Sequence, residues 1–242
     1  MSKVLAVIPS RYGATRFPGK PLALINGREM ILRVLDNAAK CKLIDDMLVA
    51  TDDERILNVV TKAGFKAVMT KPDHASGTDR IAEAVTNRDE EILVNIQGDE
   101  PTIDPASVDK AVQALLSDDA LNVSTLATPI KDMETYRNPN AVKVVFDKRG
   151  DALYFSRSPI PYSRDGSPPK EMFKHLGLYV YRRKFLVEFS GMEQGTLEKT
   201  EMLEQLRILQ NGVKIRVVVT AKDCVGIDSP EDLKKAEAII NG

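Results

Sequence analysis

Near its start the chain reads Val4-Leu5-Ala6-Val7-Ile8 and continues directly into Pro9-Ser10-Arg11-Tyr12-Gly13-Ala14-Thr15-Arg16-Phe17-Pro18-Gly19-Lys20-Pro21-Leu22. The short apolar run predicts a buried parallel strand. The loop behind it carries Arg11, Arg16 and Lys20 and two glycines. Loops of this kind, placed at the carboxyl end of a first strand, bind phosphorylated ligands in open α/β sheets. We therefore expect an α/β fold with a phosphate site at this loop.

The loop matches neither of the common nucleotide-binding signatures. Lys20 is followed by proline, whereas a P-loop requires Ser or Thr there, and the Gly-x-Gly-x-x-Gly of dinucleotide-binding folds is missing. Pro18 and Pro21 restrict the backbone, so less conformational entropy is lost when the cations are held in place. A solvated basic surface loop would account for the same side chains, but the position directly after the first strand favours a polyphosphate site.

Length and composition restrict the class of protein. The chain has 242 residues and a net charge of −1, which fits one large α/β domain and gives no sign of a nucleic-acid partner or a membrane surface. No apolar stretch reaches the roughly 18 residues of a membrane span, and no cleavable signal precedes the first strand. Two cysteines and two histidines are too few for a disulfide framework or a multi-histidine metal centre. We expect a cytoplasmic protein without membrane insertion.

Strand and helix patterns alternate through the first half of the chain. Apolar residues at helical spacing, such as Ile31, Val34 and Leu35, separate the strand-like runs, and Asp104-Pro105 begins a helix with a capping aspartate. This alternation predicts a Rossmann-like, mostly parallel, doubly wound sheet. The strands are expected at 4–8, 47–50, 67–69 and 92–96.

The second half of the chain predicts a different arrangement. Short turns between its strands indicate an antiparallel excursion, and residues 158–169 form a proline-rich loop of a length that is usually functional. We expect a single domain over residues 1–242, with a smaller mixed, partly antiparallel lobe at roughly 130–185 inserted in it. The strands of this half are expected at 122–128, 142–147, 152–156, 175–181 and 213–219.

Two aspartates are candidate metal ligands. Asp99 ends the fourth strand, and Asp228 precedes Ser229-Pro230 near the end of the sequence. A triphosphate carries about four negative charges, and Mg²⁺ bound by one or two carboxylates and by the phosphates is the usual supplement to arginine and lysine. Asp99 as a turn residue and Asp228 as a helix cap are equally good interpretations, because spacing does not show that the two carboxylates meet.

Three arginines are candidates for anion binding, and the sequence supports Arg80 more strongly than the other two. Arg80 lies in the first turn of an expected helix, where a cation opposes the helix dipole, and this points to another role such as anion binding. Arg157 ends a strand and Arg164 lies in the proline-rich loop. Surface solvation explains these two as well as convergence on a carboxylate does.

Taken together, these motifs resemble the sugar-acid cytidylyltransferase family, and within it the enzymes that activate 3-deoxy-manno-octulosonate (Kdo). The resemblance runs essentially end to end and rests on the loop at 8–22, on Gln97-Gly98-Asp99-Glu100-Pro101 and on seven further segments. It implies transfer of CMP from CTP to the anomeric hydroxyl of Kdo, with release of pyrophosphate, for lipopolysaccharide biosynthesis. The seven segments are 50–52, 74–80, 138–143, 152–157, 175–177, 201–207 and 226–232.

The family pattern also implies a role for each matching residue. Arg11 and Lys20 hold the triphosphate and Gln97 helps to position the substrates. Asp99 and Asp228 ligate Mg²⁺, and both belong with Arg11 and Lys20 to the catalytic set. The resemblance further implies that the protein is a homodimer and that part of the lobe forms the interface. The sugar-acid side is implied to comprise Arg80, Gln97, Arg157, Arg164, His175, Tyr179, Glu204 and Gln205.

Some positions depart from the family pattern. Ala14 stands where many relatives carry serine, and Asp79 replaces a glutamate before Arg80. These departures leave the acceptor open between Kdo, 8-amino-Kdo and another sugar acid such as a sialic acid. A guanylyl- or uridylyltransferase is a further alternative within enzymes. A catalytically silent nucleotide-binding module is disfavoured, because Asp99 and Asp228 are both present.

Overall fold

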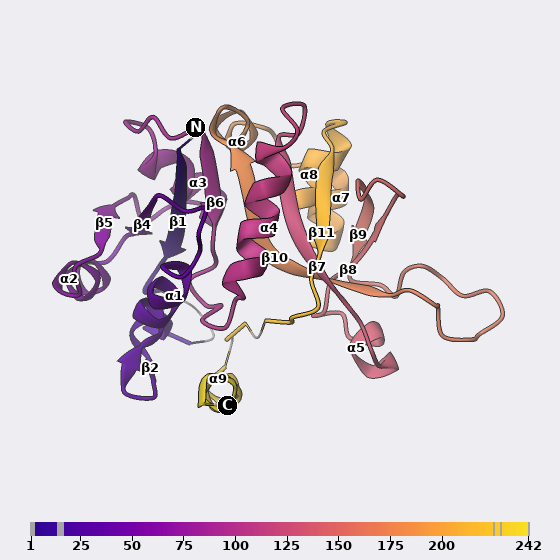
Figure 1. Ribbon diagram of the computed structural model, residues 1–242, viewed down its shortest axis with the longest axis horizontal. Helices are drawn as coiled ribbons and strands as arrows, with labels where there is room; N and C mark the ends of the chain where they lie inside the picture. The colour runs from indigo at the N-terminus through magenta and orange to yellow at the C-terminus, as the bar shows by residue number, and fades with distance from the viewer. Residues whose placement is uncertain (1–2, 14–16, 225, 228, 242) are drawn as a thin grey trace.

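The centre of the molecule is a nine-stranded sheet, which the computed structural model places in the order β11-β7-β10-β6-β1-β4-β5, with β8 and β9 attached beside β10 (Figure 1). The structure describes residues 3–13, 17–224, 226–227 and 229–241. A two-stranded hairpin, β2 (Leu24–Ile25) with β3 (Arg28–Glu29), stands apart from the sheet. The sheet consists of β1 (Val4–Ser10), β4 (Asp46–Thr51), β5 (Lys66–Met69), β6 (Ile92–Asn95), β7 (Val123–Pro129), β8 (Lys143–Phe146), β9 (Ala152–Ser156), β10 (Phe173–Arg182) and β11 (Ile215–Val219).

Helices connect most of these strands, and several begin at residues whose side chains cap them, among them the predicted Asp104. Ser76 and Asp79 form a reciprocal capping box at the start of α3, and Asp104 accepts from the Ser107 amide at the start of α4. The helices are η1 (Lys20–Leu22, a 3₁₀ turn), α1 (Met30–Ala38), α2 (Glu54–Lys62), α3 (Gly77–Ala84), α4 (Pro105–Leu116), α5 (Met133–Arg137), α6 (Arg183–Ser190), α7 (Thr196–Glu201), α8 (Gln205–Gln210) and α9 (Pro230–Asn241).

Strand directions confirm the mostly parallel, doubly wound sheet. β1 pairs in parallel with β4 and β6, β4 with β5, and β7 with β11. β10 runs antiparallel to both of its long neighbours, β6 and β7. The chain reaches β10 by way of the β8–β9 hairpin and the long loop after it, and this detour lets β10 enter the sheet from the opposite end.

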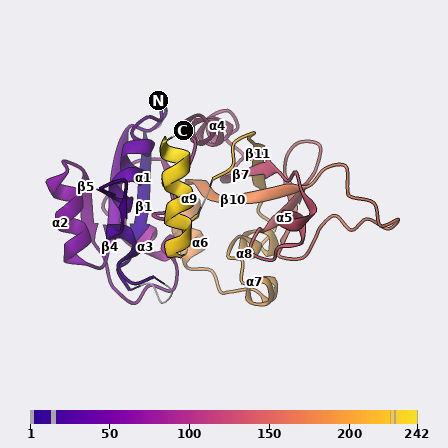
Figure 2. The same ribbon diagram turned by 90° about the horizontal axis from the view of Figure 1, so that it is seen from below.

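Alternation along β1 explains why its sequence is apolar throughout. Val4, Ala6 and Ile8 belong to a core that contains side chains of α1, α2 and α4, whereas Leu5 and Val7 belong to a second core with α3, α6 and α8. Successive strand residues point to opposite faces, so a strand covered on both faces has no polar position. Each of the valine, leucine and isoleucine side chains contributes roughly 1.5–3 kcal/mol by its burial. Figure 2 shows α4 on one side of β10 and α6, α7 and α8 on the other.

The lobe projects from one end of the sheet. It contains α5, the β8–β9 hairpin and the loop between β9 and β10, which reaches away from the body of the molecule (Figure 1). The boundaries 130–185 and the role of the lobe in a dimer stay predictions. Within the described part of the chain, no helix is both long and apolar enough to cross a bilayer.

The carboxyl ends of the central parallel strands meet at one edge of the sheet. Ser10 of β1 pairs with Thr51 of β4, and Val7 of β1 pairs with Asn95 of β6, so the loops after these strands lie together. The end of the chain returns to this region, where Ile227 and Ala236 pack against Ile25 and Met30. Ligands bind at this kind of edge in open α/β sheets.

Candidate functional site

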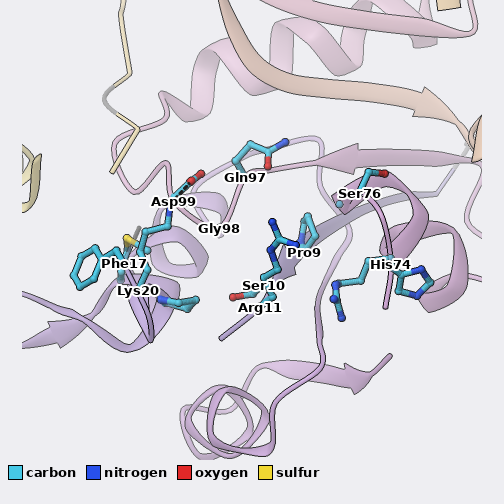
Figure 3. Close-up of a pocket in the computed structure, with 14 residues that line it drawn as sticks. Pro9, Ser10, Arg11, Phe17, Lys20, His74, Ser76, Gln97, Gly98 and Asp99 are labelled. Atoms are coloured by element: carbon cyan, nitrogen blue, oxygen red, sulfur yellow. Dashed lines mark hydrogen bonds and ion pairs between the residues drawn. The ribbon is translucent and has the colours of Figure 1, made fainter. Parts of the chain in front are cut away.

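A cavity of about 300 Å³ lies at the carboxyl ends of β1 and β6. Figure 3 shows that its walls come from three loops that are distant in sequence. It is mainly polar, and cationic side chains reach it from two sides, which suits an anionic ligand. Five of the residues that the sequence analysis proposes for the site line this cavity: Arg11, Lys20, Arg80, Gln97 and Asp99.

Lys20 and Asp99 form an ion pair in this cavity. Lys20 Nζ lies 2.6 Å from Asp99 Oδ2 and also donates to the Ile227 carbonyl at 2.7 Å. The two side chains are 14% and 33% exposed, so the ammonium and the carboxylate stand at the border between protein and cavity. A phosphate that enters the cavity therefore approaches the Lys20 ammonium, which is paired with the Asp99 carboxylate in this structure.

The backbone of the first loop explains how Lys20 is placed. The Gly19 amide donates to the Tyr12 carbonyl at 2.9 Å and closes the loop. Gly19 has a φ of 71°, and a Cβ there would lie 3.0 Å from the Tyr12 hydroxyl oxygen. Only glycine adopts this conformation next to the ring without strain. The loop conformation that places Lys20 in the cavity therefore requires glycine at position 19.

Asp99 fits the expected role as a ligand of Mg²⁺. Its carboxylate lines the cavity, and Mg²⁺ is commonly held by one or two carboxylates together with substrate phosphates. Asp228 lies outside the described residues, as does Ala14, so the pairing of the two aspartates stays a prediction. Among the residues that the structure describes, no group of three or more His, Cys, Asp or Glu is placed to hold a metal by protein ligands alone.

Arg11 and Arg80 line the same cavity but differ in their exposure and in their hydrogen-bond partners. Arg11 is exposed and makes no hydrogen bond or ion pair with another described residue. Arg80 is only 3% exposed, and its Nη2 lies 2.9 Å from Asp52 Oδ2. Arg80 also donates to Thr70 Oγ1 and to the Lys71 carbonyl, which fastens α3 to the ends of β4 and β5. Its cation is thus partly neutralised before any ligand binds.

Two neighbouring acidic residues after β4, Asp52 and Asp53, have different partners. Asp53 caps α2 by accepting from the Arg55 amide at 2.9 Å, as its place before the helix predicts. Asp52 pairs with Arg80 instead. The sequence gives no signal for this pair, because it joins residues 28 positions apart.

His175 and Tyr179 of β10 are buried and do not belong to the residues that line the cavity. His175 Nε2 lies 2.9 Å from Thr125 Oγ1, and its ring meets Phe155 edge-on at 4.9 Å. Burial lowers the pKa of His175 to about 3, so the ring is neutral at physiological pH. The Tyr179 hydroxyl is buried and has no hydrogen-bond partner among the described residues. Their roles toward the sugar acid stay predictions.

Glu204 and Gln205 lie at the start of α8, behind the cavity wall. Glu204 Oε2 accepts from Thr78 Oγ1 at 2.6 Å, and Thr78 belongs to the first turn of α3, two residues after the cavity-lining Ser76. Burial raises the pKa of Glu204. Gln205 is buried. These residues are near the cavity, but none of its lining residues comes from α8.

Arg157 and Arg164 lie in the lobe and outside the cavity lining. Arg157 Nε donates to the Glu201 carbonyl at 2.8 Å and its Nη1 to the Pro139 carbonyl at 3.0 Å, so it ties β9 to α7 and to the 138–142 turn. Arg164 is exposed in the loop between β9 and β10. In this structure neither guanidinium approaches Asp99, and their roles toward the sugar acid stay predictions as well.

Some residues of the site were not singled out from the sequence. His74 lines the cavity and its Nε2 meets Glu83 Oε2, while Met30 adds an apolar wall. Glu100 lies next to Asp99 with its carboxyl buried, and burial raises its pKa to about 7. The available signal was that His74 and Glu100 lie in two of the segments that carry the family resemblance, 74–80 and 97–101.

The cavity at the sheet edge can now be compared with known proteins. Residues 5–215 match a family model described as cytidylyltransferase. The chain belongs to the cytidylyltransferase family. A protein of Syntrophotalea carbinolica named 3-deoxy-manno-octulosonate cytidylyltransferase is 50% identical to it and covers 99% of both chains. A protein of the same name from Syntrophus aciditrophicus is 48% identical over 100% of this chain and 99% of its own.

Solved structures agree with this assignment. A CMP:2-keto-3-deoxy-manno-octonic acid synthetase complexed with CTP superposes with a TM-score of 0.94 at 43% identity, covering 99% of both chains. A 4-diphosphocytidyl-2C-methyl-D-erythritol synthase from Anaerococcus prevotii superposes with a TM-score of 0.67 at 17% identity, which shows a shared fold. The recognition of the family from its motifs is thus confirmed, and so is the fold class.

The buried His175 leads to a prediction about stability and pH. In the unfolded chain a histidine takes up a proton below its ordinary pKa of 6.5, whereas folded His175 resists protonation down to about 3. Its contribution to stability is therefore present above pH 6.5 and is lost as the pH falls toward 3. Between pH 7.5 and pH 5 this loss is about 2 kcal/mol. Urea unfolding of the wild type and His175→Gln at both pH values measures it. The variant should lose less stability over this interval, and equal losses would contradict the assignment.

Proposed function

We propose that this protein transfers CMP from CTP to the anomeric hydroxyl of Kdo and releases pyrophosphate. The observation that carries the proposal is the convergence of Arg11, Lys20, Gln97 and Asp99 from two distant loops on one cavity. The relatives that match end to end carry the name of this activity, and the solved relative described above is complexed with CTP. We also propose that the reaction serves lipopolysaccharide biosynthesis in the cytoplasm.

The chemistry requires an anion-stabilising site more than a covalent catalyst. The anomeric hydroxyl attacks the α-phosphorus of CTP, and pyrophosphate leaves in line with it. Negative charge grows on the phosphate oxygens, where it is stabilised by Lys20, which Asp99 and the Ile227 carbonyl already hold in place, and by the exposed Arg11. Lys20 exchanges Asp99 for phosphate as its partner, so its charge is neutralised in both states. The Gln97 side-chain amide donates to the Gly177 carbonyl at 3.2 Å. This bond holds the loop after β6, which lines the nucleotide cavity, against β10.

Mg²⁺ is part of this proposal, with Asp99 and Asp228 as its protein ligands. A bound divalent ion offsets the charge of the triphosphate and lowers the pKa of the attacking hydroxyl, so no separate side-chain base is needed. The support from this chain is the cavity-lining carboxylate of Asp99. Removal of the ion with a chelator should therefore stop turnover, and added Mg²⁺ should restore it.

Pyrophosphate release with CTP and Mg²⁺ tests the proposal. Kdo, 8-amino-Kdo and N-acetylneuraminate are compared as acceptors, and the four nucleoside triphosphates are compared with Kdo. Strong release with CTP and Kdo is the expected result. A preference for 8-amino-Kdo would keep the chemistry and change the acceptor. No release with any of the three acceptors would overturn the proposed reaction.

A homodimer formed through the lobe is the remaining part of the proposal. Leu153, Tyr162 and Met202 are large apolar residues in or beside the lobe with exposures of 64%, 87% and 76%. Exposed apolar groups of this kind are typical of interfaces between subunits. Light scattering should give about twice the chain mass of 26.7 kDa. The double variant Leu153→Asp/Tyr162→Asp should be monomeric, and Leu24→Asp, which alters an apolar residue of the β2 hairpin that is also exposed, should remain dimeric. A wild-type monomer would contradict the dimer.

A further inference from the structure

Glu100 is a partly buried acidic residue whose carboxyl reaches into the protein and which the proposed chemistry does not use. Its neighbour Asp99 lines the cavity, whereas the Glu100 Oε2 atom is buried and has no hydrogen-bond partner among the described residues. A buried carboxyl with incomplete hydrogen bonding costs free energy, and an apolar residue of similar size would pack there at lower cost. The need for a stable core therefore does not explain a glutamate at this position.

One side of Glu100 lies against β10. A Cβ added to Gly177 would lie 3.3 Å from Glu100 Oε1 and 3.6 Å from Gln97 Cγ, so the loop after β6 rests directly on this glycine. Gly177 lies where the pairing of β10 with β7 shifts register, between Leu176 and Tyr179. The loop that carries Asp99 is thus fitted to an irregularity of β10.

The other side of Glu100 faces the segment at 223–227, of which the structure describes Asp223, Cys224, Gly226 and Ile227. The Cys224 thiol lies close to the Glu100 carboxyl, which together with burial, the larger cause, raises the pKa of this thiol. The Ile227 amide donates to the Asp99 carbonyl at 2.9 Å, and the Ile227 carbonyl accepts from Lys20 Nζ at 2.7 Å. One carboxyl therefore stands where the Asp99 loop, β10 and the 223–227 segment meet.

We propose that Glu100 is a positioning residue, which holds the Asp99 loop against Gly177 and against the 223–227 segment and so fixes where the Asp99 carboxylate stands. Through Ile227 it also fixes the carbonyl that orients Lys20. The functional consequence rests on the role of Asp99 and Lys20 in the proposed function. The attachment of Ile227 to the Asp99 loop does not depend on the proposed function, because these contacts exist without substrate.

The test compares Glu100→Ala and Glu100→Gln with the wild type in two measurements without a sugar acid. Hydrogen exchange at the Ile227 amide reports whether the 223–227 segment stays on the Asp99 loop. Calorimetric titration with CTP and Mg²⁺ reports the affinity of the cavity. In Glu100→Ala we expect Ile227 to exchange at least about tenfold faster and CTP to bind about tenfold more weakly, the size typical of lost supporting contacts at such sites. Glu100→Gln keeps the shape and the contact with the thiol and should stay within about threefold in both.

Two further variants separate positioning from a general loss of stability. Glu90→Ala removes a carboxylate that is 7% exposed and ion-paired with Arg88, just before the opposite end of β6. It should lower the melting temperature without changing either measurement. Gly177→Ala displaces Glu100 without removing it and should reproduce the changes of Glu100→Ala, which keeps the test valid if that variant does not fold.

Unchanged Ile227 exchange and CTP affinity in Glu100→Ala would overturn the proposal. An equal loss in Glu100→Gln would also overturn it, because the amide preserves the packing. If the wild type failed to use Kdo, the proposed acceptor would be wrong, but faster Ile227 exchange in Glu100→Ala would still establish the mechanical role.

Discussion

Asp99→Asn lowers the rate of CMP transfer on the order of a thousandfold, the effect expected when a preorganised charge is removed from a transition state. The amide keeps the size of the side chain but loses its negative charge. It then offers Mg²⁺ one neutral oxygen and no longer holds the Lys20 ammonium, which lies 2.6 Å from it. Pyrophosphate release at saturating CTP and Kdo measures the loss.

The fold should survive this substitution. The ion pair is partly exposed, and such pairs contribute at most about 1 kcal/mol to the free energy of unfolding. Asp119→Asn removes the same charge from a fully exposed side chain and should retain wild-type activity. A value for Asp99→Asn within tenfold of the wild type, with an unchanged melting temperature, would mean that Asp99 neither binds the metal nor orients Lys20.

The parallel half of the sheet was predictable because its signals are local. The run at 4–8 is apolar at every position since both faces of β1 are covered, and the capping residues Ser76 and Asp104 stand at the helix starts that they mark in the sequence. The direction of β10 was not predictable in the same way. It depends on the end at which the chain re-enters the sheet, and no local pattern within 173–182 records that.

The nucleotide side of the site was predictable for a related reason. Lys20 and Asp99 each follow a buried strand, and the carboxyl ends of parallel strands share one edge of the sheet. Pairs between distant residues were not visible, as Arg80 with Asp52 illustrates. The roles of His175 and Arg157 toward the sugar acid came from family resemblance alone, and their present contacts are with Thr125 and Glu201. Solved complexes with the sugar acid would test these roles.

Arg207 and Glu198 form a buried ion pair that supports the helix behind the cavity. Arg207 Nε and Nη2 each lie 2.7 Å from a different oxygen of Glu198, and the two side chains are 7% and 6% exposed. Arg207 Nη1 also donates to the Met192 carbonyl at 3.0 Å. The pair joins α7 to α8, the helix that follows Glu204. Removal of Glu198 leaves the buried Arg207 cation with only the Met192 carbonyl and the Glu204 carboxylate, 3.9 Å away, which is more costly than the loss of the pair itself.

Glu198→Ala should therefore lower the free energy of unfolding by about 3 kcal/mol or more. For a chain of this length that corresponds to a fall in melting temperature of roughly 6–12 °C. The double variant Glu198→Leu/Arg207→Met removes both charges and should recover most of the loss, because well-packed apolar residues replace buried ion pairs at little cost. Lys66→Ala breaks the pair with Asp46, in which the lysine is 63% exposed, and should change the free energy by less than about 1 kcal/mol. Urea unfolding of the four proteins gives the comparison. A decrease in the free energy of unfolding for Glu198→Ala no larger than that for Lys66→Ala would contradict this prediction. The Arg207 charge would then have found water or another partner, and α8 would be held by its apolar contacts alone.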